Sequence, residues 1–141
     1  METTKIGLEQ TVAEIQKILG KYGVGAVMTE YDKGEVIALN FRIRISDKNI
    51  PFRLTSRWEP IHEVLSSRYA RDPRKADLIS QAKRVSWRQT LRWIEASLAY
   101  AGTSMVKFQQ LLMGFIQVDI KGQTLYEKLE QKGLLGLEDK R

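Results

Sequence analysis

The chain has 141 residues, 43% of them hydrophobic, and its 23 basic and 17 acidic residues give a net charge of +6. This length and apolar content suit a single folded domain over residues 1–141 rather than a disordered chain. The chain has no cysteine and one histidine, which excludes disulfides, thiolate catalysis, zinc fingers, iron–sulfur clusters and a His-pair metal site.

The sequence pattern predicts neither a membrane span nor an export signal. No apolar run approaches the roughly 18 residues that a membrane span needs. The first residues, Met1–Lys5, also lack the apolar core of a signal peptide. We therefore expect a protein that makes no membrane contact and acts in the cytoplasm.

The first predicted element is a helix over residues 8–20, where apolar residues recur at spacings of four, three and four. These residues are Leu8, Val12, Ile15 and Leu19. Gly20 and Gly23 predict the end of this helix. A strand is predicted at 24–31, followed by the turn Asp32-Lys33-Gly34.

Residues 36–45 predict a strand with one apolar face and an opposite face that becomes basic along its length. The apolar face consists of Ile37, Leu39, Phe41, Ile43 and Ile45. A third strand is predicted at 50–57, and Pro51 near its start favours an edge position in the sheet.

A four-residue loop at 46–49 would match every apolar pair of these two strands, which is what fixes register in a half-buried sheet. The same register places Arg42 directly opposite Arg53, and opposed like charges are destabilising. We expect an acid such as Glu30, or an anion from outside, to offset the repulsion. Such local conflicts tend to occur at functional places.

Helices are predicted for the second half of the chain. Glu59-Pro60 and Asp72-Pro73 are helix-start signals, and the helix from Pro73 is expected to reach about Ala101. Residues 105–117 are apolar on more than one side, which predicts a helix buried in the core or in an oligomer interface.

Residues 124–127, Thr-Leu-Tyr-Glu, have the spacing of a capping box for a last short helix. The predicted order is therefore an N-terminal helix, a three-stranded antiparallel sheet and a C-terminal helical bundle. This order belongs to the α+β class.

Positive charge is concentrated in residues 42–92, which hold 13 basic and 5 acidic residues, a net of +8, while the remainder of the chain is −2. Ten of these 13 are arginine, whose planar guanidinium suits phosphate or carboxylate. Uneven charge indicates the kind of partner rather than the fold. The alternative is a solvated surface whose charges pair within the chain.

The candidate contacts with a polyanion are basic side chains of the outer strand face and of one stripe along the long helix. One aromatic residue at the strand-to-helix junction could stack on bases. The set is Arg42, Arg44, Arg53, Arg57, Arg74, Lys75, Arg84, Arg88, Arg92 and Trp58. The alternative for the arginines is a solvated or internally paired side chain, and for Trp58 it is packing in the core.

An enzyme is the third possibility. Glu30, Asp32 and Glu35 flank the first hairpin and could hold Mg²⁺ for phosphoryl chemistry, although acids are common beside turns. His62 is a possible general base or a surface histidine. The chain has no glycine-rich phosphate loop or nucleophile elbow, so we expect no catalytic residue, metal or cofactor.

The segment Ala82-Lys83-Arg84-Val85-Ser86-Trp87-Arg88 resembles a helix of a group of small bacteriophage and prophage proteins. Those proteins carry Arg-Val-x-Trp-Arg, then Trp and Glu-Ala, here Trp93-Ile94-Glu95-Ala96, and a late Thr-x-Tyr-Glu, here residues 124–127. The resemblance implies a phage or mobile-element origin, and hence the cytoplasm of a host cell. The helix–three-strand–helix order is also similar to double-stranded RNA-binding domains and to phage single-strand annealing proteins, in topology alone.

The leading hypothesis is a non-enzymatic nucleic-acid-binding protein that contacts the phosphate backbone with little sequence specificity. Single-stranded nucleic acid is the mildly preferred partner. Self-association through the 105–117 helix would strengthen weak contacts by avidity. The alternative is a protein-binding module that docks on an acidic host or phage protein, for which the same arginines would serve. A metal-dependent nuclease is the third hypothesis.

Overall fold

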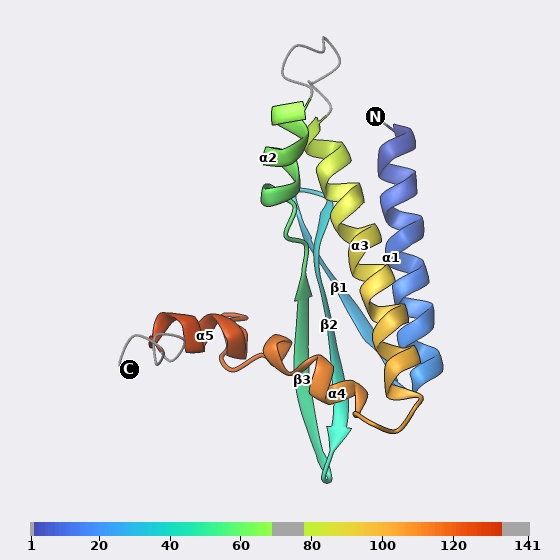
Figure 1. Ribbon diagram of the computed structural model, residues 1–141, viewed down its shortest axis with the longest axis vertical. Coiled ribbons are helices and arrows are strands. Elements are labelled where there is room, and N and C mark those ends of the chain that lie inside the picture. The colour runs from blue at the N-terminus through green and yellow to red at the C-terminus, as the bar shows by residue number, and fades with distance from the viewer. Residues whose placement is uncertain (1, 69–77, 134–141) are drawn as a thin grey trace. The chain divides into compact units, whose positions relative to one another are not determined.

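The computed structural model describes residues 2–68 and 78–133, and for residues 2–6 the backbone alone. It has the predicted α+β class, with an N-terminal helix, a three-stranded antiparallel sheet and then helices (Figure 1). None of the helices in the described part is long and apolar enough to cross a bilayer.

The elements follow one another in the order that the sequence pattern predicts. They are α1 Glu2–Tyr22, β1 Val27–Asp32, β2 Glu35–Ile45, β3 Lys48–Thr55, α2 Glu59–Arg68, α3 Leu78–Ala101, α4 Phe108–Leu111, the 3-10 helix η2 Met113–Phe115 and α5 Leu125–Gln131.

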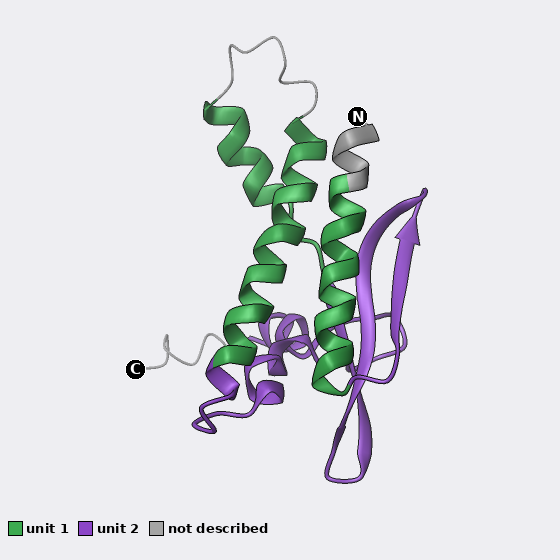
Figure 2. Cartoon of the chain, turned by 90° about the vertical axis from the view of Figure 1, so that its right-hand side faces the viewer, with its two compact units in different colours: residues 1–23, 55–99 green, residues 24–54, 100–141 purple. Residues whose placement is uncertain are grey.

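The chain forms two compact units, each built from two separate segments (Figure 2). Unit 1 consists of residues 1–23 and 55–99 and contains α1, α2 and α3. Unit 2 consists of residues 24–54 and 100–141 and contains the sheet, α4, η2 and α5. The organisation as one domain stays a prediction.

In unit 1, α1 and α3 lie side by side (Figures 1 and 2). Ile15 and Leu19 of α1 and Trp87 and Ile94 of α3 are fully buried. Each pair is separated by four or seven residues, which places its members on one face of the helix. The apolar stripe predicted for the first helix is therefore confirmed for this pair, and α3 has a buried face of the same kind.

In unit 2, β1 and β2 pair in an antiparallel register that aligns Glu30 with Ala38 and then Tyr31 with Val36. Ile37 is the extra residue at this irregularity, which has the form of a β-bulge. Val36 and Ala38 are buried, as are Leu39, Phe41 and Ile43 of the predicted apolar face. The face that was expected to become basic along its length thus begins apolar and buried, and its exposed arginines follow later in β2.

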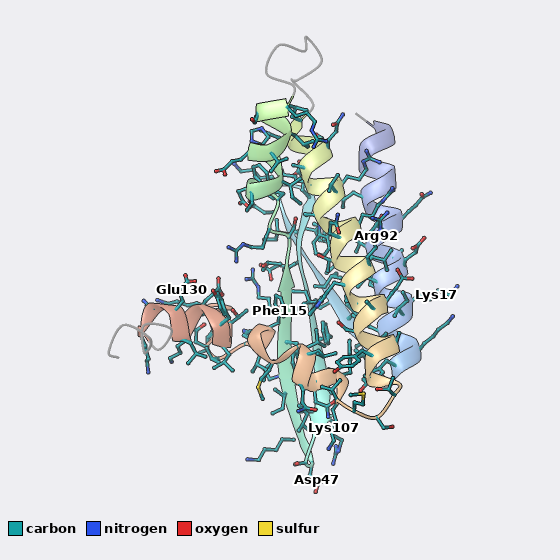
Figure 3. All side chains as sticks on the ribbon, in the orientation of Figure 1. Lys17, Asp47, Arg92, Lys107, Phe115 and Glu130 are labelled. Carbon is teal, nitrogen blue, oxygen red and sulfur yellow. The ribbon has the colours of Figure 1, made fainter. Side chains whose placement is uncertain are left out.

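The turn between β2 and β3 has two residues, Ser46 and Asp47, with φ of 49° and 68°; Asp47 marks its tip (Figure 3). Positive φ at both positions is typical of a type I′ hairpin turn. The predicted four-residue loop was wrong. A two-residue turn places Phe41 opposite Phe52, and their rings stack with centroids 5.7 Å apart.

Counting outward from the two-residue turn, Asn40 lies opposite Arg53, and Arg42 lies opposite Pro51. The predicted clash between Arg42 and Arg53 is therefore absent, because the register differs by two residues. Moving by two keeps the apolar face of β3 toward the core, so hydrophobicity alone could not distinguish the two registers.

β3 is an edge strand, as Pro51 predicted, and its outer edge is met by a later segment. The Gln117 amide donates to the Pro51 carbonyl at 2.9 Å, and Phe52 forms an isolated bridge with Ile116. The N–H and C=O of one residue in a strand face the same neighbour. An N–H at position 51 would therefore face this outer edge and not β2. Proline, which has no N–H, thus costs no hydrogen bond between β2 and β3.

The predicted helix over 105–117 is wrong. α4 has four residues and η2 has three, and Ile116 already bridges β3. Phe108 is fully buried, whereas Met105 is 76% exposed. The self-association expected from this segment therefore has no continuous helix to support it.

The capping box predicted at 124–127 is confirmed. The Glu127 carboxylate accepts from the Thr124 amide at 2.8 Å, and the Thr124 hydroxyl accepts from the Glu127 amide at 3.4 Å. The two residues thus satisfy orphan donors at the start of α5.

Candidate functional site

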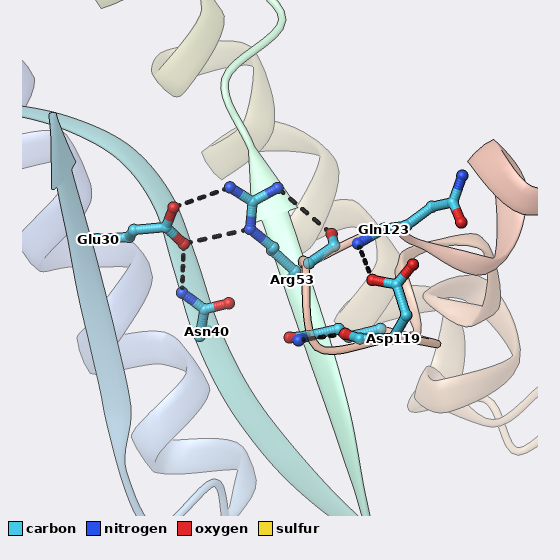
Figure 4. Close-up of polar contacts among 7 residues, drawn as sticks. Glu30, Asn40, Arg53, Asp119 and Gln123 are labelled. Carbon is cyan, nitrogen blue, oxygen red and sulfur yellow. Dashed lines mark hydrogen bonds and ion pairs between the residues drawn. The ribbon is translucent and has the colours of Figure 1, made fainter.

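Glu30, Asn40 and Arg53, one from each strand, form a polar network on one face of the sheet (Figure 4). Arg53 Nη2 and Nε donate to the two Glu30 carboxylate oxygens at 2.9 and 3.2 Å. Asn40 Nδ2 donates to Glu30 Oε1 at 3.1 Å. Glu30 is thus the acid that was expected near these arginines, and it offsets the charge of Arg53.

This network is partly shielded from solvent, with the Arg53 side chain 19% and the Glu30 side chain 37% exposed. Hydrogen bonds from Arg53, and then from Asn40, hold the pKa of the Glu30 carboxyl below its ordinary value of 4.5. Burial opposes this lowering without reversing it.

Arg53 also forms a hydrogen bond with the loop that precedes α5. Its Nη1 donates to the Gly122 carbonyl at 3.5 Å. Gly122 has φ +91°, and a Cβ there would lie 3.2 Å from Arg53 Nε. Glycine is needed because the backbone is left-handed and the guanidinium passes so close. The role of Arg53 in unit 2 is therefore structural.

Arg42 and Arg44 lie on β2 on the same face as Asn40, because residues two apart in a strand share a face, and both are exposed. Arg44 Nη2 lies 3.6 Å from Asp47 Oδ1, but the two side chains are 67% and 96% exposed. Such pairs contribute little. Arg42 makes no ion pair with any residue that the structure describes.

A groove of about 930 Å³ lies beside these arginines in unit 2. Its lining comes from all three strands and from the loop after Ile116, and we name it the sheet groove. Side chains that line it include Met28, Asn40, Arg42, Pro51, Gln117 and Ile120.

Two of these side chains present large apolar surfaces to solvent. Met28 is 65% exposed and Ile120 is 101% exposed. Asp119 also lines the groove, and its Oδ1 accepts from the Gln123 amide at 2.9 Å (Figure 4).

The remaining arginine candidates in the described part belong to unit 1. Arg57, Arg88 and Arg92 are exposed and form no ion pair with a described residue. Figure 3 shows Arg92 on α3. Arg84 is half-buried, and its buried Nε has no hydrogen-bond partner within residues 2–68 and 78–133.

Trp58 is half-buried and already has two neighbours on its ring. Lys83 Nζ lies 5.2 Å from the ring centroid, and His62 packs edge-on at 6.0 Å. A cation over the face of an indole is itself a favourable contact. The ring is therefore engaged within unit 1 rather than open for stacking.

Arg74 and Lys75 lie outside the described residues. The structure gathers Arg42, Arg44 and the network of Arg53 on one sheet face of unit 2. It places Arg88 and Arg92 four residues apart on α3 of unit 1.

No metal site accompanies these arginines in the part of the chain that the structure describes, since no group of three or more His, Asp or Glu side chains is suitably placed. Glu30 is committed to Arg53 and Asn40. Asp32 and Glu35 oppose each other at the end of the β1–β2 hairpin.

The sequence pattern did not reveal the sheet groove, because its wall depends on the loop at 117–123 meeting the edge of β3. One signal was present in the sequence. Ile120 is a large apolar residue inside the otherwise polar turn over 119–122, although one exposed apolar residue is by itself ordinary.

No protein-family model matches the chain, and no curated protein or solved structure is significantly similar to it. The function is therefore inferred from the residues of the site.

Proposed function

We propose that this is a non-enzymatic nucleic-acid-binding protein that holds the phosphate backbone through exposed arginines. The observation that carries the proposal is the state of Arg42 and Arg44. Arg42 has no ion pair with a described residue, and Arg44 has only a solvent-exposed one. Guanidinium groups in this state are free to make bidentate contacts with phosphate.

Arg57, Arg88 and Arg92 are exposed in the same way and supply further phosphate contacts. Arg53, Arg84 and Trp58 are left out of this set, because Arg53 and Trp58 already have partners and Arg84 is half-buried. Phosphate contacts carry no base information, so weak sequence specificity is expected. The proposed setting is the cytoplasm of a host cell, given the resemblance of residues 82–88 to phage proteins.

The first test is the binding of a fluorescently labelled 20-nucleotide strand, measured by anisotropy at 50 and 200 mM salt. We expect micromolar or tighter binding at low salt. If five arginines each contact a phosphate, affinity falls about a hundredfold at the higher salt, because each contact releases counterions. Absence of binding, or binding that salt does not weaken, contradicts the proposal.

The double variant Arg42→Ala/Arg44→Ala is expected to bind more weakly at low salt and to lose part of the salt dependence. The matched control is Lys17→Ala/Lys21→Ala, which removes two exposed charges of α1 that lie outside the candidate set. An equal loss in both double variants would mean that net charge, not this strand face, drives binding.

A further inference from the structure

The sheet groove combines apolar side chains, amide groups and an arginine. Its apolar side chains come first. Met28 and Ile120 offer large exposed apolar side chains, and Pro51 adds a rigid apolar ring. Isolated exposed apolar residues are ordinary on protein surfaces. Here they line one concavity and come from separate chain segments, which is how binding grooves are built.

The groove also carries polar groups suited to recognition. Asn40 and Gln117 also line the groove, and each already donates one amide hydrogen bond, to Glu30 Oε1 and to the Asp119 carbonyl, which leaves the oxygen and the second N–H of each amide for a ligand. Arg42 lines the same groove, and Arg44 continues the positive charge along the strand. Within the groove, the charge of Arg42 is balanced by Asp119, so charge alone does not select what binds inside it.

An unpaired nucleotide matches this combination. Its base has a flat apolar face and a hydrogen-bonding edge, and its phosphate carries the negative charge. A duplex buries the base faces in its stack and pairs their edges, so only a single strand can use the groove.

We propose that the sheet groove takes unpaired bases of single-stranded nucleic acid, with Arg42 holding the adjoining phosphate. This inference rests on the proposed function and names its substrate class. At about 930 Å³ the groove is at the upper end of the range of small-molecule sites. It therefore contacts a few bases, and the exposed arginines follow the rest of the strand.

The test compares three labelled ligands by anisotropy: a 20-nucleotide single strand, the duplex of the same sequence, and an abasic 20-unit strand with the same phosphates. The wild-type protein is expected to prefer the single strand by at least about fivefold over the other two. This follows from base contacts, which the duplex conceals and the abasic strand lacks.

The diagnostic variant is Met28→Ala/Ile120→Ala, which truncates two exposed side chains. It is expected to bind the single strand about tenfold more weakly, because the truncation removes apolar surface that the bases would cover, and to bind the abasic strand as well as the wild type does. Its dependence on salt should not change, since no charge is removed. Met105→Ala is the matched control, because Met105 is 76% exposed in unit 2 and does not line the groove.

Three outcomes would overturn this assignment, and they are distinguishable. Equal, salt-sensitive binding of all three ligands would mean that the groove does not bind bases, while the proposed binding of the phosphate backbone would still hold. Absence of binding to every ligand would remove both. Unchanged affinity of Met28→Ala/Ile120→Ala for the single strand would also place the bases elsewhere.

Discussion

The ion pair with Glu30 gives Arg53 a different role from the other arginines of the sheet. All of them are basic residues of the same sheet face, yet only Arg53 receives a two-point ion pair, at 2.9 and 3.2 Å. The carboxylate occupies the Nε and Nη2 edge of the guanidinium and the Gly122 carbonyl takes Nη1, so three of its five N–H donors are engaged within the chain. A single acidic neighbour thus converts a candidate binding residue into a structural one.

The ion pair predicts a pH-dependent contribution to stability. The pKa of Glu30 is lowered in the folded protein, so its contribution is present above about pH 4.5 and is lost as the pH falls through the lowered value. Glu30→Gln is expected to reduce the free energy of unfolding by about 1 kcal/mol at pH 7. The difference from wild type should shrink toward pH 3.

Urea unfolding at pH 7 and pH 3 measures this effect. Asp47→Asn is the control, because it removes the carboxylate of the Arg44–Asp47 ion pair, which is 96% exposed, and should leave stability essentially unchanged. A loss in Glu30→Gln that is as large at pH 3 as at pH 7 would mean that packing, not charge, accounts for it.

At the scale of elements, the loop before α5 depends on one glycine. Gly122→Ala would introduce a Cβ 3.2 Å from Arg53 Nε at a backbone with φ +91°. We expect a loss of about 1–2 kcal/mol in the free energy of unfolding. Gly20→Ala is the matched control, since Gly20 lies in α1 with open space around it.

The two glycine variants should therefore change the urea midpoint in opposite directions. Gly20→Ala is expected to stabilise by up to about 1 kcal/mol, because alanine has the higher helix propensity. Destabilisation of both would show that the comparison reports a general cost of replacing glycine rather than the contact with Arg53.

The sequence was sufficient for those elements whose signals are local. Alternation in residues 36–45 predicted β2, and the Thr124–Glu127 box predicted the start of α5. It was insufficient where tertiary contacts decide. Residues 105–117 have an apolar composition that suits a helix. The Gln117 amide instead donates to the Pro51 carbonyl, so the end of this segment pairs with the sheet edge and is not helical.

The candidate site shows the same division. Exposure of Arg42 and Arg44 followed from strand alternation. The pairing of Arg53 with Glu30 required the register between strands, which a two-residue turn determines. The groove required a loop far along the chain to meet β3, and no local pattern specifies that meeting.

Over the whole molecule, positive charge is present in both units. By the sequence, unit 1 has 12 basic and 8 acidic residues, a net of +4, and unit 2 has 11 basic and 9 acidic residues, a net of +2. Neither unit is a strongly charged body, so the expected contacts are individual guanidinium groups rather than a broad field. The number of such phosphate contacts can be measured from the salt dependence of the affinity.

The slope of log affinity against log salt provides the count, because it registers each phosphate contact wherever it lies on the molecule. Every contact to a single strand contributes about 0.7 to the slope. Arg88→Ala/Arg92→Ala in unit 1 and Arg42→Ala/Arg44→Ala in unit 2 should therefore each lower it by about 1.4, and the fourfold variant by about 2.8. Titrations between 50 and 200 mM salt measure these slopes, with Lys17→Ala/Lys21→Ala as the charge-matched control. If the slope of Arg88→Ala/Arg92→Ala equals that of the wild type, the α3 arginines do not contact phosphate, and the contacts are left to Arg57 of unit 1 and the strand arginines of unit 2.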